Sequence, residues 1–134
     1  MNNIRPLHVG ISVYNIEESI KWYEKNLDFK KISDDYYDFL KARVVFIKNK
    51  DFEIELFEYI KPKELPKERK LPNSDLQTVG TKHIAFYTDN ISNLLDRFKA
   101  NDVDIVMENV MEGNFMCFIR DNSGILIEFI EKKF

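Results

Sequence analysis

Apolar and polar residues alternate at the start of the chain and then change to a helical repeat. In residues 7–14 the odd positions are apolar, which predicts a strand with one buried face. Residues 15–27 instead carry apolar side chains three or four positions apart, the single stripe of an amphipathic helix. Asn15 is its expected N-cap, and Asp28 follows its expected end.

The same order of elements occurs twice. After the first helix, short apolar or alternating runs predict three strands, and a second strand, helix and three strands follow later in the chain. The predicted strands are 7–14, 29–33, 39–48, 52–60, 81–88, 103–107, 114–120 and 125–131, and the second helix is 91–101, capped by Asn90.

A charged segment with three prolines, residues 61–78, separates the two series. It is long for an unstructured connection, so it either joins two modules or covers something. We expect a first module at 1–60, a linker at 61–78 and a second module at 79–134, together forming one domain over 1–134. The basic residues of the linker could attract an anionic substrate, but a solvated loop is the favoured interpretation.

The two modules are related as an internal repeat. A shift of 75 positions superposes His8 on His83, and a shift of 73 superposes Glu55 on Glu128. These are the only two histidines of the chain, and both fall on the first strand of a module. Each glutamate falls on the last strand.

Two imidazoles and two carboxylates, one of each per module, can converge where two sheets face each other. They would form a four-ligand site for a divalent metal with one or two open positions. Taken alone, a histidine or glutamate on a strand is usually structural or exposed, but the repeated placement favours the metal site. The other glutamates near these strands are interpreted as solvent-facing, namely Glu53, Glu58, Glu108, Glu112 and Glu131.

Composition and charge exclude several classes of protein. Apolar residues make up 44% and charged residues 32%, typical of a globular protein, and the net charge of −3 disfavours nucleic-acid binding. No apolar run is long enough for a membrane helix, and the start lacks a signal-peptide pattern. The single cysteine, Cys117, lies in an apolar strand and is interpreted as a core residue. We therefore expect a cytoplasmic protein with no membrane or nucleic-acid partner.

The chain resembles the vicinal-oxygen-chelate superfamily, also called the glyoxalase/bleomycin-resistance/dioxygenase fold. The resemblance implies an α+β fold of two paired βαβββ modules, an open barrel-like mixed sheet with helices outside, a divalent metal and a homodimer. It covers nearly the whole chain, and the matching segments are His8-Val9-Gly10-Ile11-Ser12-Val13, Trp22-Tyr23-Glu24-Lys25-Asn26-Leu27-Asp28-Phe29, Ile54-Glu55-Leu56-Phe57, Gly80-Thr81-Lys82-His83-Ile84-Ala85-Phe86 and Asp121-Asn122-Ser123-Gly124-Ile125-Leu126-Ile127-Glu128-Phe129.

Within that superfamily the ligand set is similar to that of glyoxalase I, lactoylglutathione lyase. The resemblance implies His8, Glu55, His83 and Glu128 as ligands of one nickel, cobalt, zinc or manganese ion. Glyoxalase I usually has an arginine and an asparagine that hold the glutathione carboxylate, and Ser12 and Tyr59 stand in their places. Arg5, Lys82 or a linker lysine could take over that contact.

The expected reaction is proton transfer next to a carbonyl through a metal-bound enediolate, on the hemithioacetal of methylglyoxal and glutathione. Glu128 is the first candidate for the base and Glu55 the second. Two alternatives stay open: an epimerase or other enzyme of the superfamily that acts on an acyl-CoA or a different thiol adduct, and a non-enzymatic small-molecule binding or resistance protein.

Overall fold

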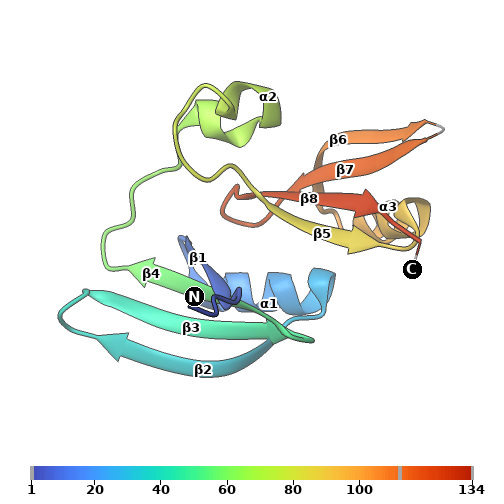
Figure 1. The fold of residues 1–134 in the computed structure, drawn as a ribbon. Coiled ribbons are helices and arrows are strands. Elements are labelled where there is room, and N and C mark those ends of the chain that lie inside the picture. The colour runs from blue at the N-terminus through green and yellow to red at the C-terminus, as the bar shows by residue number, and fades with distance from the viewer. Residues whose placement is uncertain (1, 112, 134) are drawn as a thin grey trace. The chain divides into compact units, whose positions relative to one another are not determined.

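The computed structural model describes residues 2–111 and 113–133, and Glu112 lies outside these residues. The chain divides into two compact units, Met1–Lys63 and Glu64–Phe134 (Figure 1). Each unit contains one four-stranded sheet and one long helix. No helix in the described part of the chain has the length and apolarity needed to cross a membrane.

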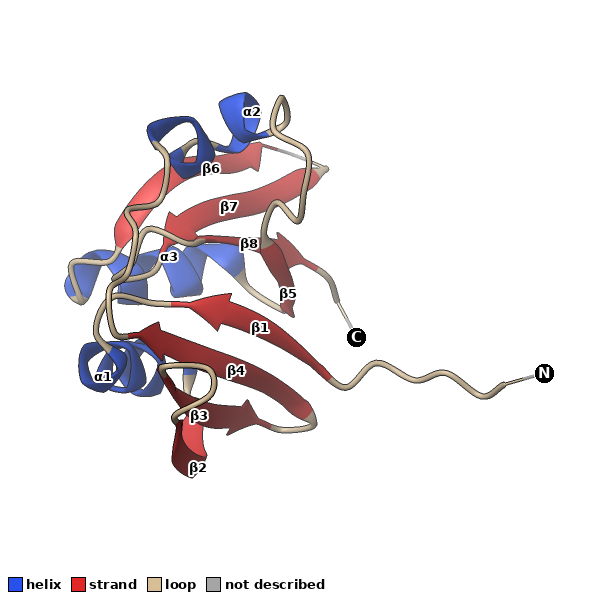
Figure 2. Cartoon of the chain, turned by 90° about the vertical axis from the view of Figure 1, so that its left-hand side faces the viewer, coloured by secondary structure: helices blue, strands red, loops and turns tan. Residues whose placement is uncertain are grey.

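The first unit has strand order β1-β4-β3-β2. Strands β1 and β4 run parallel, side by side in Figure 2, and the other neighbours are antiparallel. The elements are β1 (His8–Ser12), α1 (Ile16–Leu27), β2 (Lys30–Tyr37), β3 (Ala42–Asn49) and β4 (Phe52–Tyr59).

The second unit repeats this topology with strand order β5-β8-β7-β6, in which β5 and β8 are parallel. Two short helices precede the repeat. The elements are η1 (Lys67–Lys70), α2 (Pro72–Asp75), β5 (Ile84–Thr88), α3 (Ile91–Ala100), β6 (Asp104–Met111), β7 (Asn114–Arg120) and β8 (Leu126–Glu131). The predicted α+β class, with two βαβββ modules built from mixed sheets and an outer helix each, is confirmed.

Both long helices start as the sequence predicts. The side chain of Asn15 accepts a hydrogen bond from the Glu18 amide at 3.1 Å, and Asn90 does the same for Asn93 at 2.8 Å. At the other end of α1, Asp28 adopts a left-handed conformation and closes the helix. The apolar stripes of the helices pack on one face of each sheet and form its core.

Glu58 and Glu131, which the sequence predicts to face solvent, instead contact the N-termini of the two long helices. The Glu58 carboxylate on β4 accepts a hydrogen bond from the first amide of α1, Ile16, at 2.6 Å. Glu131 on β8 accepts one from the first amide of α3, Ile91, at 2.9 Å. Each carboxylate therefore satisfies a free N–H and opposes the positive end of a helix dipole, tying the last strand of a unit to its helix.

Glu58→Ala is expected to lower the free energy of unfolding by about 1–2 kcal/mol, because it removes a partly buried charged acceptor from a helix N-terminus. Urea denaturation measures the change. Glu53→Ala on the same strand is the control and is expected to stay within about 0.5 kcal/mol of the wild type. Equal losses in both variants would contradict the capping role.

The structure corrects several strand boundaries, and the strand predicted from Thr81 begins only at Ile84, so His83 stands just before its strand. The strand predicted at 29–33 continues to Tyr37, and the strand predicted from Phe39 begins only at Ala42. Between them the chain turns, with Leu40 bonded to the carbonyl of Tyr37 and Lys41 in the left-handed region. Strand β2 is an edge strand with mostly exposed side chains, so it carries no alternation that would reveal its length. The predicted strand 103–107 likewise extends to Met111.

The segment predicted as a linker is largely folded against the second unit. It contains η1 and α2, and the carbonyl of Lys70 accepts a hydrogen bond from the Arg120 guanidinium on β7 at 2.8 Å. Of its basic residues, Arg69 donates hydrogen bonds to the Asp75 carboxylate and the Thr81 carbonyl, whereas Lys61, Lys63 and Lys67 are exposed, as expected for a solvated loop.

Candidate metal centre

Strand β4 separates buried and open side chains by simple alternation. Ile54 and Leu56 are fully buried on the side where Glu58 reaches α1. Glu55 and Phe57 consequently point to the opposite face, away from the helix. The register pairs Gly10 of β1 with Glu55, so His8, two residues earlier, lies on this same open face.

His8 and Glu55 meet on that face. The Nε2 atom of His8 lies 3.0 Å from Oε2 of Glu55, with 27% and 21% of the two side chains exposed. Phe46 stands opposite Glu55 in the β3–β4 register, and its ring meets the His8 imidazole edge to face at 5.2 Å. The phenyl ring limits the orientations of the imidazole that keep Nε2 beside the carboxylate.

The second unit repeats the arrangement. The Nε2 atom of His83 lies 2.9 Å from Oε2 of Glu128, with 30% and 17% of the side chains exposed. Phe118 stands opposite Glu128 and meets the His83 ring edge to face at 5.0 Å. Each unit thus presents one imidazole, one carboxylate and one phenyl ring in equivalent positions.

The two phenylalanines are the part of this arrangement that the sequence reasoning missed. A shift of 72 positions superposes Val44-Val45-Phe46-Ile47-Lys48 on Met116-Cys117-Phe118-Ile119-Arg120. The sequence therefore contained this repeat as well, at a shift of 72 positions instead of the 73 that aligns the glutamates. It escaped notice because an apolar residue in an apolar strand is ordinarily interpreted as core packing.

The two units differ in the residue that stands opposite the glutamate, which is Gly10 in the first unit. A Cβ at this position would lie 3.2 Å from the Phe57 ring and 3.7 Å from the Glu55 carboxylate. In the second unit Ala85 takes the equivalent place opposite Glu128, and Ile130 stands where the first unit has Phe57. The larger aromatic neighbour in the first unit thus leaves room only for glycine without adjustment.

The donor atoms fit a divalent metal. Metal–nitrogen and metal–oxygen bonds of about 2.0–2.2 Å place two neighbouring donors about 3.0 Å apart when they meet at the right angle of an octahedral site with open positions. The observed separations of 3.0 and 2.9 Å match this value, and they equally suit a direct hydrogen bond. Among the described residues, no three His, Cys, Asp or Glu side chains come together as a ready metal cage. Each unit supplies two donors.

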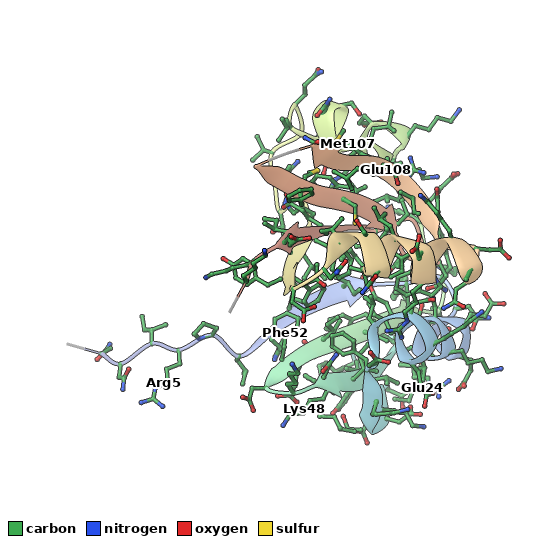
Figure 3. All side chains as sticks on the ribbon, turned by 90° about the vertical axis from the view of Figure 1, so that its right-hand side faces the viewer. Arg5, Glu24, Lys48, Phe52, Met107 and Glu108 are labelled. Atoms are coloured by element: carbon green, nitrogen blue, oxygen red, sulfur yellow. The ribbon has the colours of Figure 1, made fainter. Side chains whose placement is uncertain are left out.

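The residues considered for a glutathione carboxylate lie in different places. Ser12 and Tyr59 are exposed and share the open face with Glu55. Arg5 lies on the extended segment that precedes β1 (Figure 3). The Lys82 ammonium is held by the Asp75 carboxylate at 3.1 Å and by backbone carbonyls, so the fold already uses this cation.

Cys117 is a core residue, as predicted. Its side chain is fully buried, and burial raises the pKa of the thiol to about 11, with the nearby carboxylates of Glu108 and Glu128 adding to the effect. We expect a thiol reagent at pH 8 to modify the folded protein at least about 100-fold more slowly than the urea-unfolded protein. Equal rates in the two states would contradict the buried placement.

The match to a family model identifies the class of protein. A family model described as Glyoxalase/Bleomycin resistance protein/Dioxygenase superfamily matches residues 5–129, and the chain belongs to this superfamily. Its members typically bind a divalent metal and small molecules. No relative among curated proteins matches the chain.

Solved structures with the same fold include glyoxalases. A glyoxalase family protein from Enterococcus faecalis has a TM-score of 0.80 at 19% identity, covering 95% of this chain and 97% of that chain. The trypanothione-dependent glyoxalase I of Leishmania major has a TM-score of 0.76 at 24% identity, covering 96% and 87%. Glyoxalase I from Zea mays has a TM-score of 0.74 at 20% identity, covering 97% of this chain and 45% of that chain.

Proposed function

We propose that this protein is a metal-dependent lyase of the glyoxalase I type. One divalent ion is held by His8 and Glu55 of the first unit together with His83 and Glu128 of the second. The observation that carries the proposal is the repeated imidazole–carboxylate pair, at 3.0 Å in one unit and 2.9 Å in the other. Neither pair alone supplies enough donors for tight binding, since protein sites for such ions use three or four ligands.

The donor set balances the charge of the ion. Two neutral imidazoles and two carboxylates neutralise a divalent cation, and this mixture of nitrogen and oxygen donors suits nickel, cobalt, zinc or manganese. When bound, the ion supplies Lewis acidity that makes a C–H group next to a carbonyl more acidic.

Glu128 is the proposed base. Its carboxylate removes a proton from C1 of the hemithioacetal formed by methylglyoxal and a thiol, and returns a proton to C2, which yields a lactoyl thioester. Glu55 is the second candidate because it occupies the equivalent position in the first unit. Both side chains are about four-fifths buried, so a carboxylate there is shielded from bulk water yet reachable from the open face.

Glutathione is the first thiol to test. Ser12 and Tyr59 are the reason to test other substrates as well. These two residues occupy the open face where a cation and an amide are expected for glutathione, and neither carries a charge that would bind a carboxylate. This favours tests with other thiols, including the trypanothione used by the Leishmania major relative, and with acyl-CoA esters as epimerase substrates.

The deciding experiment removes all metal and restores nickel, cobalt, zinc and manganese separately. Each form is assayed with methylglyoxal and glutathione, with trypanothione, and with a racemisable acyl-CoA ester. Turnover of a hemithioacetal that requires metal supports the lyase. Stoichiometric metal binding with acyl-CoA turnover alone identifies an epimerase. Metal binding without turnover points to a binding protein, and failure to bind any of the ions overturns the proposal.

A further inference from the structure

The two histidines are held in place by different means. His8 is the first residue of β1, and its backbone is in register with Glu53 of β4. His83 precedes β5, whose pairing with β8 begins only at Ile84. A strand ladder therefore fixes the backbone of His8, whereas the backbone of His83 requires another support.

Asp75, at the end of α2, contacts Lys82 directly and is linked to Thr81 through Arg69. Its carboxylate oxygen Oδ1 accepts hydrogen bonds from Arg69 Nε at 3.0 Å and Lys82 Nζ at 3.1 Å. The Lys82 ammonium also bonds the carbonyls of Asp75, at 2.5 Å, and Thr78. The Arg69 guanidinium in turn bonds the carbonyl of Thr81. Both residues immediately before His83 are thus tied to the segment 64–78.

Asp75, Arg69 and Lys82 form a cluster, and the burial of its carboxylate makes the cluster sensitive to the loss of one member. Asp75 is 1% exposed, and its Oδ2 atom has no hydrogen-bond partner among the described residues. Burial raises the pKa of Asp75, but the hydrogen bonds and positive charges of Arg69 and Lys82 together lower it by more, so the group stays a carboxylate at neutral pH. A buried carboxylate between two cations is a rigid link, because no member can leave without stranding a charge.

We propose that Asp75 is a positioning residue, which through Lys82 and Arg69 sets the place of His83 beside Glu128. The proposal rests on the proposed function, since it concerns the same metal site. It assigns a role to the proline-containing segment that the repeat leaves unexplained: the second unit uses this segment where the first unit uses a strand ladder.

Asp75→Asn tests the link, since it keeps the size of the side chain and removes its charge. We expect metal affinity to fall by about 10–100-fold, the usual cost of losing an outer-shell support, and turnover at saturating metal to recover most of the wild-type value. A direct chemical role would instead leave turnover low at every metal concentration.

Two measurements on the metal-free protein test whether Asp75 positions His83. The chain has only two histidines, so its imidazole NMR spectrum contains two sets of signals, and His8 serves as an internal reference. In Asp75→Asn the His83 signals are expected to shift and those of His8 to stay. Amide hydrogen exchange is expected to become faster in residues 79–85 and to be unchanged in residues 5–11.

Two further variants separate positioning from general destabilisation. Ile119→Val trims a fully buried side chain of the same unit on the helix-covered face, and is compared at a matched loss of melting temperature. Its metal affinity and His83 signals are expected to stay at the wild-type values. Lys82→Met breaks the link at its other end and is expected to reproduce the Asp75→Asn signature, also where Asp75→Asn fails to fold.

Unchanged His83 signals, or equal changes at His8 and His83, would overturn the positioning role. A wild-type protein that binds no metal would overturn the proposed function, while the NMR and exchange measurements would still decide whether Asp75 positions His83.

Discussion

Glu128→Gln is expected to lower turnover by about 10²–10⁴-fold, the contribution of a positioned general base, in the metal-loaded protein. Glutamine keeps the size of the side chain and one oxygen donor, so metal binding is expected to weaken far less. Initial rates with the hemithioacetal give the first effect, and calorimetric metal titration gives the second. Equal losses of turnover, metal affinity and substrate affinity would make Glu128 a ligand only.

Glu55→Gln is the matched variant for this test, since Glu55 holds the equivalent register position in the first unit. It is expected to affect metal affinity to the same extent as Glu128→Gln but turnover much less. A larger loss of turnover in Glu55→Gln would exchange the roles of the two carboxylates.

His8→Ala and His83→Ala are each expected to abolish metal-dependent turnover, although the two residues belong to different units. Loss of a direct ligand should cost more metal affinity than the about 10–100-fold attributed to outer-shell partners. Metal titration and circular dichroism together separate loss of the ligand from loss of the fold. Ser12→Ala, on the same open face as His8, is the control and is expected to bind metal normally. If only one histidine matters, the four-ligand proposal is wrong.

The same two variants test whether the site is built within one chain or from both chains of a homodimer. Mixing and re-equilibrating His8→Ala with His83→Ala produces some dimers with one variant in each chain. If a site combined the first unit of one chain with the second unit of the other, half of the sites in these mixed dimers would be intact. Activity would then recover toward a quarter of the wild-type value. A site built within one chain would give no recovery.

The elements with a strong periodic signal could be predicted from the sequence. Helices α1 and α3 follow from an apolar stripe and from the caps Asn15 and Asn90. The extent of β2 could not be predicted, because an exposed edge strand has no buried face to impose alternation. The hydrogen bonds of Glu58 and Glu131 to helix N-termini were also missed. They join residues 42 and 40 positions apart, and a polar position in an alternating strand looks solvent-facing.

The candidate site was partly visible in the repeat. His8 with Glu55, and His83 with Glu128, were predicted from matching positions, and the structure places each pair within 3.0 Å. Whether the two pairs bind one ion stays a prediction. The cluster around Asp75 could not be predicted, because a charged segment with prolines is usually solvated, and only the tertiary contacts show a buried carboxylate.

The unequal support of the two histidines affects how each half can change in evolution. A ladder such as that of His8 tolerates few insertions, since a shift by one residue would turn the side chain to the other face of the sheet. The backbone before His83 is instead held by side-chain contacts of Arg69, Asp75 and Lys82, which can be altered by substitution while β5 and β8 keep their pairing. Substitutions in residues 64–82 can thus change the position of His83 in the second unit without any change in the pairing of its strands.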